Sequence, residues 1–170
     1  MLRMFLKYQV LAQFLLSTKQ KKKLSRLNIM LILETIKVPA KIESLHQCMD
    51  FVASCAQKQG LDSRSINRIE LATDEALVNI FNYAYSDCGG DVEISCMIDH
   101  NAMFVIEITD SGVPFNVLDA PDPDIAADIE QRKIGGLGIF MIKKIMDDVQ
   151  YRRESGKNYL TLKVFKTGSC

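Results

Sequence analysis

The sequence has 170 residues, 48% of them hydrophobic and 25% charged, which is the length of one domain with enough apolar side chains for a core. Basic and acidic residues number 21 each, but they are unevenly placed along the chain. Residues 1–30 carry seven basic groups and no acidic one, which leaves residues 31–170 with 14 basic and 21 acidic groups, a formal charge of −7. A region this acidic argues against direct nucleic-acid binding, which needs a basic surface.

Residues 1–30 form a basic N-terminal extension. Hydrophobic residues in its first half are spaced for one face of a short helix, and a lysine-rich run follows at 19–23. The apolar stretch is much shorter than the roughly 20 residues of a transmembrane helix, and no cleavage site of a secretory signal precedes the lysines. Three interpretations remain: a membrane-surface helix, a basic tail that binds a partner, or an upstream start codon before a start at Met30.

The cysteines include no Cys-x-x-Cys pair, and their number is odd: Cys48, Cys55, Cys88, Cys96 and Cys170. With only two histidines in the chain, this spacing predicts no zinc site. We therefore expect reduced thiols in a cytoplasmic protein.

The regular pattern begins after Met30. Alternating side chains predict a strand over 31–38, which Pro39 ends. Apolar residues at three- and four-residue steps predict a helix over 44–59 that stops at Gly60. A second helix is predicted over 64–85, with Asp62 or Ser63 as its N-cap.

Further strands are predicted over 92–98 and 103–109, with a turn between them at 99–101. An acidic, proline-containing loop at 113–133 precedes a helix over 137–146 and a closing hairpin of strands, 149–153 and 159–165. This order predicts an α/β two-layer sandwich, with a mostly antiparallel sheet and helices on one face. A loop this long in a compact domain is typical of a functional lid or of disorder.

Three segments carry chemistry. Glu75, Asn79 and Asn82 share one stripe of the helix 64–85, beside its apolar face, as expected for a helix that lines a pocket. Gly135-Gly136-Leu137-Gly138 precedes a helix, where free amides and the helix dipole favour an anion. Asp110-Ser111-Gly112 ends a strand. Taken singly, these segments are more often a solvated helix face and two plain turns than parts of a binding site.

Together, the order and spacing of these segments resemble the three boxes of the GHKL ATPase superfamily, the group of gyrase, Hsp90, MutL and histidine-kinase ATPase domains. The N box is Glu75 to Asn79, and the two glycine boxes are 110–115 and 135–139. The resemblance covers about 34–166. Within the superfamily, the chain is similar to the bacterial anti-sigma factor serine kinases of the RsbW and SpoIIAB type, a branch favoured by Pro114-Phe115 and Met146-Asp147-Asp148.

The resemblance implies a Bergerat-type fold over 31–170 that binds ATP and Mg²⁺ beneath a lid at 117–133. Glu75 would be the general base, Asn79 would coordinate Mg²⁺, and Asp110 would accept a hydrogen bond from the adenine amino group. The other candidate nucleotide-binding residues are Asn82, Gly112, Gly135, Gly136, Leu137 and Gly138, the glycines because no Cβ blocks a close approach. Pro114 stands where many relatives have a second glycine, which makes the first box more rigid.

The function implied by the resemblance is that of a serine protein kinase. It would phosphorylate an anti-sigma factor antagonist of the STAS class and sequester a sigma factor by partner switching, and the resemblance also implies a homodimer. A histidine kinase would need a helical hairpin that this pattern lacks, and gyrase, Hsp90 and MutL types need further domains. The alternative that remains is a nucleotide-gated sequestering module without phosphotransfer.

Overall fold

The computed structural model describes residues 30–85, 89–116, 118–119 and 137–165. The predictions for residues 1–29, and for nearly all of the lid at 117–133, lie outside this part of the chain. The elements follow in the order β1 (Leu31–Pro39), η1 (Ile42–Ser44), α3 (Leu45–Lys58), α4 (Ser63–Tyr83), β2 (Asp91–Ile98), β3 (Phe104–Asp110), α5 (Leu137–Ile145), β4 (Asp148–Glu154) and β5 (Lys157–Val164). Each strand and helix predicted after Met30 is confirmed to within a few residues at its ends.

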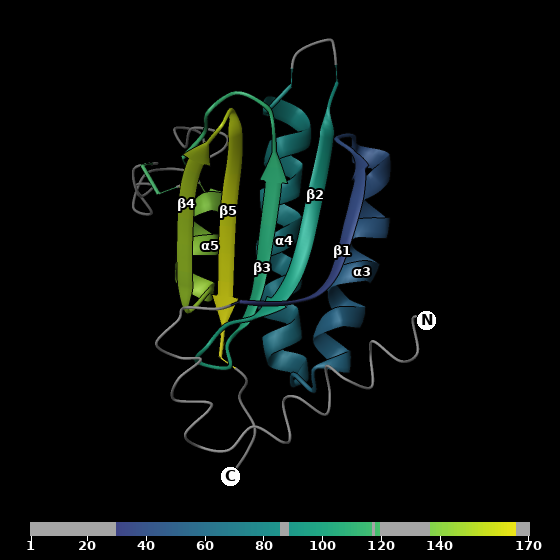
Figure 1. Cartoon of the computed structure of the whole chain (residues 1–170), viewed down its shortest axis with the longest axis vertical. Helices are drawn as coiled ribbons and strands as arrows, with labels where there is room; N and C mark the ends of the chain where they lie inside the picture. The colour runs from purple at the N-terminus through teal and green to yellow at the C-terminus, as the bar shows by residue number, and fades with distance from the viewer. Residues whose placement is uncertain (1–29, 86–88, 117, 120–136, 166–170) are drawn as a thin grey trace, which may run out of the picture.

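The strands form one sheet of order β1-β2-β3-β5-β4, in which every neighbouring pair is antiparallel. Figure 1 shows the helices α3, α4 and α5 together behind one face of this sheet. The predicted two-layer sandwich is therefore confirmed. No helix in the described ranges is both long and apolar enough to cross a membrane.

Local signals fix the two ends of the α3–α4 connection. Gly60 adopts φ +74°, and the amides of Gly60 and Leu61 donate to the carbonyls of Gln57 and Ala56, which closes α3 with a Schellman motif. Asp62 then caps α4, because its side chain accepts a hydrogen bond of 2.7 Å from the amide of Ser65. The predicted stop at Gly60 is confirmed, and of the two predicted cap residues, Asp62 and Ser63, the structure shows Asp62 as the N-cap.

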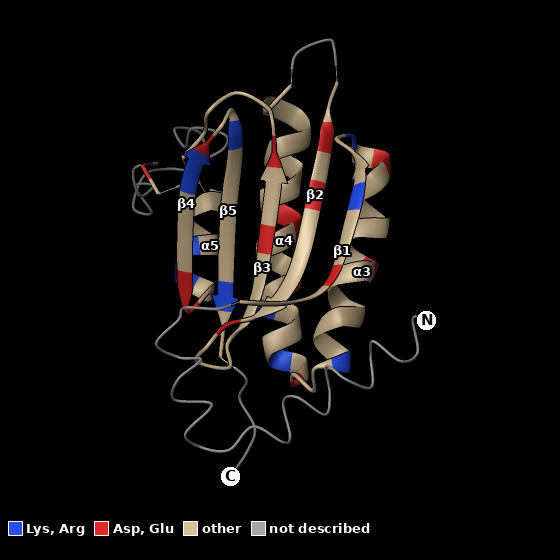
Figure 2. Cartoon of the chain, viewed as in Figure 1, with Lys and Arg blue, Asp and Glu red and all other residues tan. Residues whose placement is uncertain are grey.

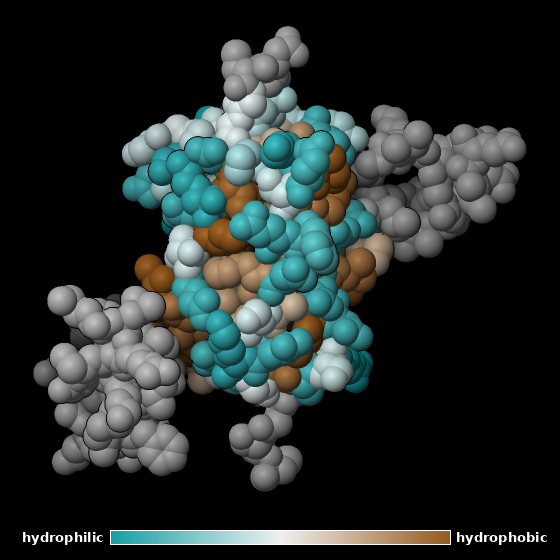
Figure 3. Space-filling view, turned by 90° about the vertical axis from the view of Figure 1, so that its right-hand side faces the viewer, coloured by the Kyte–Doolittle hydropathy of each residue, from teal (hydrophilic) through white to brown (hydrophobic). Residues whose placement is uncertain are grey.

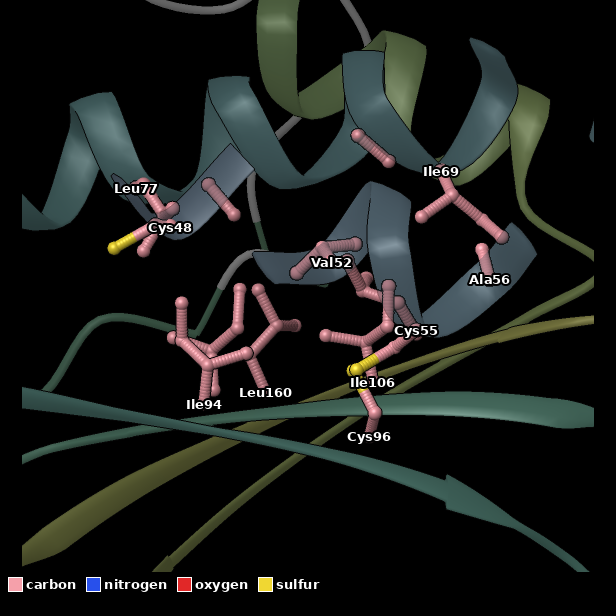
Figure 4. Packing of buried hydrophobic residues seen from close by; sticks show 14 of the residues in the cluster. Cys48, Val52, Cys55, Ala56, Ile69, Leu77, Ile94, Cys96, Ile106 and Leu160 are labelled. Carbon is pink, nitrogen blue, oxygen red and sulfur yellow. The ribbon is translucent and has the colours of Figure 1, made fainter. Parts of the chain in front are cut away.

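The core lies between the helices and the inner face of the sheet. In Figure 4, side chains of α3 and α4, among them Val52 and Ile69, lie over Ile94, Ile106 and Leu160 of the sheet. Cys48, Cys55 and Cys96 are free and buried in this layer. Burial raises the pKa of the Cys48 thiol, and contact with Cys55, together with burial, raises that of Cys96. The two thiols therefore stay protonated at neutral pH.

The β1 edge of the sheet carries charged side chains beside the exposed Ile32. Figure 3 looks onto the side of the molecule where β1 and α3 lie, and hydrophilic residues cover much of it, with separate hydrophobic patches. Glu34 on β1 pairs with Lys58 at 2.8 Å, and Lys37 pairs with Asp91 at 2.9 Å. Charged side chains of this kind discourage pairing of an edge strand with other chains.

Arg68 on α4 holds the C-terminal end of α5. Its Nε donates to the carbonyl of Ile145 at 2.6 Å, and its Nη2 contacts Asp147 Oδ1 at 2.7 Å. Asp147 in turn accepts a hydrogen bond from the amide of Phe165. Arg68 thereby satisfies a carbonyl that the helix end leaves without an intrahelical partner.

Arg68→Met should lower the free energy of unfolding by about 1–3 kcal/mol, because it removes charge-assisted hydrogen bonds at a half-buried helix end. Urea denaturation measures the change. Arg64→Met is the matched control, since Arg64 lies exposed at the start of the same helix and should change stability by less than about 0.5 kcal/mol. Equal effects of the two substitutions would show that the contacts with α5 contribute nothing.

Candidate functional site

A pocket opens between the C-terminal half of α4 and one end of the sheet. Its empty space, with the open solvent at its mouth counted in, is about 540 Å³. Most of its surface is apolar, and its polar groups come from α4, β3, β4 and β5. The lining residues are Ala76, Asn79, Ile80, Tyr83, Ala84, Asp110, Val113, Phe115, Tyr151, Asn158 and Leu160.

Asp110 is the buried carboxylate of this pocket, with 5% of its surface exposed at the end of β3. Its Oδ1 accepts hydrogen bonds from the amide of Gly112 at 2.8 Å and from Asn158 Nδ2 at 2.9 Å. No described residue donates to Oδ2. The second oxygen is therefore available to a donor on a ligand, at the position that the sequence predicted for base recognition.

Asn158 is a pocket residue that the sequence analysis did not identify. The register pairs it with Asp110 on one side and with Arg153 on the other. Its Oδ1 accepts from Tyr151 Oη at 2.8 Å and from Arg153 Nη1 at 2.6 Å. Its Nδ2 also donates to the carbonyl of Val113 at 3.0 Å. Figure 2 shows the acidic end of β3 and the basic end of β4 at the same end of the sheet.

The three candidate site residues on α4 lie in three different environments. Asn79 lines the pocket, its Nδ2 donates to the Glu75 carbonyl at 2.7 Å, and no described residue donates a hydrogen bond to its Oδ1. Glu75 lies outside the pocket lining and against the first turn of α5, where a Cβ on Gly138 would overlap its carboxylate. Asn82 is exposed and does not line the pocket. The helix turns Tyr83 and Ala84 toward the pocket instead.

The loop that follows Asp110 is fastened to the end of α4. The amide of Val113 donates to the Ala84 carbonyl at 2.8 Å, and Tyr85 Oη accepts from the amide of Ser111 at 2.9 Å. A Cβ on Gly112 would overlap the Ala84 carbonyl and lie 2.6 Å from the Ala84 Cβ. The contact with Ala84 therefore gives Gly112 a structural reason to lack a side chain, a reason different from the predicted approach of a nucleotide.

The second glycine segment is only partly described. Gly135 and Gly136 lie outside the described residues, whereas Leu137 and Gly138 begin α5. Within the described ranges, no three His, Cys, Asp or Glu side chains gather as a metal site. The free Oδ1 of Asn79 is a hard oxygen ligand of the kind that Mg²⁺ takes together with phosphate oxygens, so the donor chemistry fits this ion.

Comparison with known proteins gives the same assignment over most of the chain. A family model described as "Histidine kinase-like ATPase domain" matches residues 38–164. Proteins named serine-protein kinase RsbW, from Bacillus cereus (strain AH820) and Bacillus thuringiensis (strain Al Hakam), are 30% identical over 132 residues, which cover 75% of this chain and 82% of each relative.

A solved structure shares the fold. It is the crystal structure of the RsbU and RsbW domains of a Mycobacterium tuberculosis protein, with a TM-score of 0.52 and 14% sequence identity. The match covers 77% of this chain and 32% of that one, so the present chain spans about a third of that structure.

Proposed function

The chain belongs to the family of histidine kinase-like ATPase domains and, within it, to the RsbW serine-protein kinases, and we propose that it transfers the γ-phosphoryl group of ATP to a serine of a partner protein. The observation that best supports this proposal is the buried Asp110 carboxylate, which has one oxygen occupied and the other available in the pocket. The 6-amino group of adenine is a donor suited to that oxygen.

The proposed reaction uses Glu75 as the general base. Its carboxylate takes the proton of the serine hydroxyl, whose oxygen attacks the γ-phosphorus as the bond to the bridging oxygen of ADP breaks. Glu75 lies beside the first turn of α5, where backbone amides favour phosphate, so the base and the phosphate-binding end are adjacent. Asn79 would hold Mg²⁺, which, when bound, neutralises charge on the phosphate oxygens.

The partners proposed for this chain follow from the RsbW family. The phosphorylated substrate is an anti-sigma factor antagonist of the STAS class, and the second partner is a sigma factor that the chain sequesters. The nucleotide state selects between them, because a switch of this kind requires a ligand that binds two states with different affinity. We also propose that the chain acts in the cytoplasm and that it forms a homodimer.

The second candidate function is a nucleotide-gated module that sequesters a partner without phosphotransfer. It would need the pocket around Asp110 but not a base. The carboxylate of Glu75, retained beside α5, favours the kinase.

The test is Mg²⁺-dependent binding of ATP and GTP, measured by titration calorimetry on the wild type and on Asp110→Asn. The wild type should prefer ATP, and the substitution should raise the Kd for ATP by about 10- to 100-fold, the loss expected for a hydrogen bond to a charged group. Asp50→Asn, on the exposed face of α3, is the control and should bind like the wild type. Absence of nucleotide binding to the wild type would refute the proposal.

A further inference from the structure

The side chain of Asn158 makes many hydrogen bonds in addition to the backbone pairing of its strand. It is 5% exposed and lies between the carboxylate of Asp110 and the guanidinium of Arg153. Its side-chain amide contacts the Asp110 carboxylate, the Tyr151 hydroxyl, the Arg153 guanidinium and the carbonyls of Gly112 and Val113. These groups come from β3, β4 and the loop after Asp110.

The neighbours of Asn158 fix which way its amide points. A guanidinium can only donate hydrogen bonds, so the oxygen of the Asn158 amide must face Arg153. The NH₂ group then faces Asp110 and the two loop carbonyls, all of which accept. The reversed amide would set its oxygen against three acceptors and its NH₂ group against Arg153.

This orientation determines the hydrogen-bonding character of Asp110. Its Oδ1 receives two N–H donors, from Gly112 and Asn158, and these two hydrogen bonds fix the plane of the carboxyl group. No described residue donates to Oδ2, which is the oxygen left to accept a hydrogen bond from a ligand in the pocket.

We propose that Asn158 is the positioning residue that sets base selectivity: it holds the Asp110 carboxyl group so that Oδ2 accepts a hydrogen bond from the ligand, and the pocket takes a purine with a 6-amino group and rejects one with a 6-oxo group. The inference rests on the proposed nucleotide binding and adds a specificity-determining residue to it. A 6-oxo group would face the Asp110 carboxylate oxygen without a hydrogen to donate, so that the buried oxygen would stay unpaired. Leaving a buried polar group unpaired discriminates strongly between similar ligands.

β4 provides a matched pair of arginines for the test. Arg153 donates to Asn158 Oδ1 and to the Gly112 carbonyl at 3.1 Å. The adjacent Arg152 points to the other face of the sheet, where it pairs with Glu107 at 2.7 Å and stacks on Tyr159. Arg153→Met should disturb the orientation of Asn158, whereas Arg152→Met removes the same charge without touching it.

The experiment measures the ratio of the Kd for inosine triphosphate to the Kd for ATP, since these nucleotides differ at C6. The wild type should prefer ATP by about tenfold or more. Asn158→Asp should bring the ratio to within about twofold of one, because two carboxylates at this distance share a proton and Asp110 gains a donor. Asn158→Leu, which frees the carboxylate plane, should also lower the ratio.

Thermal melting shows whether the Asn158 variants fold. If they do not fold, the variants Arg153→Met and Arg152→Met still test the inference. Arg153→Met should lower the ratio several-fold, and Arg152→Met should leave it at the wild-type value. A wild type that prefers ATP, with the same ratio in the folded Asn158 variants and in Arg153→Met, would overturn the inference and leave the proposed function intact. A wild type that binds neither nucleotide would refute both.

Discussion

Phosphorylation of the proposed STAS-class substrate should slow by about 10²- to 10⁴-fold in Glu75→Gln, the contribution typical of a general base. The amide keeps the shape of the side chain against Gly138 but cannot accept the serine proton. Because Glu75 does not line the pocket, the Kd for ATP should stay within about twofold of the wild-type value. Single-turnover transfer from γ-labelled ATP, together with calorimetric titration of ATP, measures both quantities.

Glu70→Gln is the matched control for this substitution. Glu70 lies on α4 as well, outside the pocket lining, so the same change of charge at that position should leave the transfer rate unaltered. Equal transfer by Glu75→Gln and the wild type would remove Glu75 from the reaction. No transfer by either protein, with ATP binding intact, would support the sequestering module instead.

A methyl group at position 112, in the loop that packs on the end of α4 beside the pocket, should lower both stability and ATP affinity. Gly112→Ala places a Cβ on the Ala84 carbonyl, a backbone atom that cannot rotate away. The loop must then move from α4, with loss of the Val113–Ala84 hydrogen bond. We expect a loss of about 1–3 kcal/mol in unfolding free energy from overpacking, with a further loss of about 1 kcal/mol from the hydrogen bond.

ATP affinity should fall together with stability in Gly112→Ala, because the Gly112 amide also holds Asp110. Thermal melting and titration calorimetry report the two effects. Ser111→Ala is the control, since Ser111 is exposed and only its backbone amide takes part in the loop. If Gly112→Ala has the same melting temperature as the wild type, the contact of the loop with α4 is not tight.

The fold was predictable because its signals are local. The apolar period of α4 and its cap at Asp62 depend only on residues that are close together in the sequence. The structure confirms both. The prediction for Asn82 rested on the same helical period, which relates residues along one helix. The pocket is defined instead by the loop that crosses the helix end at Ala84, and no periodicity within α4 contains that information.

Asn158 could not be found from the sequence for a similar reason. It follows Ser155 and Gly156, which turn the hairpin at φ 50° and 82°, so an asparagine there fits an ordinary turn. Its importance comes from the pairing of β5 with β3, which brings it to a carboxylate 48 positions away. Only the register of the sheet reveals that partnership.

The strand order has a consequence for how the chain folds. β2 and β3 form one hairpin and β4 and β5 form another, whereas β1 pairs with β2 across α3 and α4, and β3 pairs with β5 across α5 and β4. Closing these two longer loops has an entropic cost that the hairpins do not have, so we expect β1 and the β4–β5 hairpin to dock onto the β2–β3 hairpin late. Asp110 lies on β3 and Asn158 lies opposite it on β5, so the two residues meet only when β3 and β5 have paired. Any ligand that needs both residues in place stabilises the docked hairpin, so cooperative opening of the β4–β5 unit becomes rarer as ligand is added.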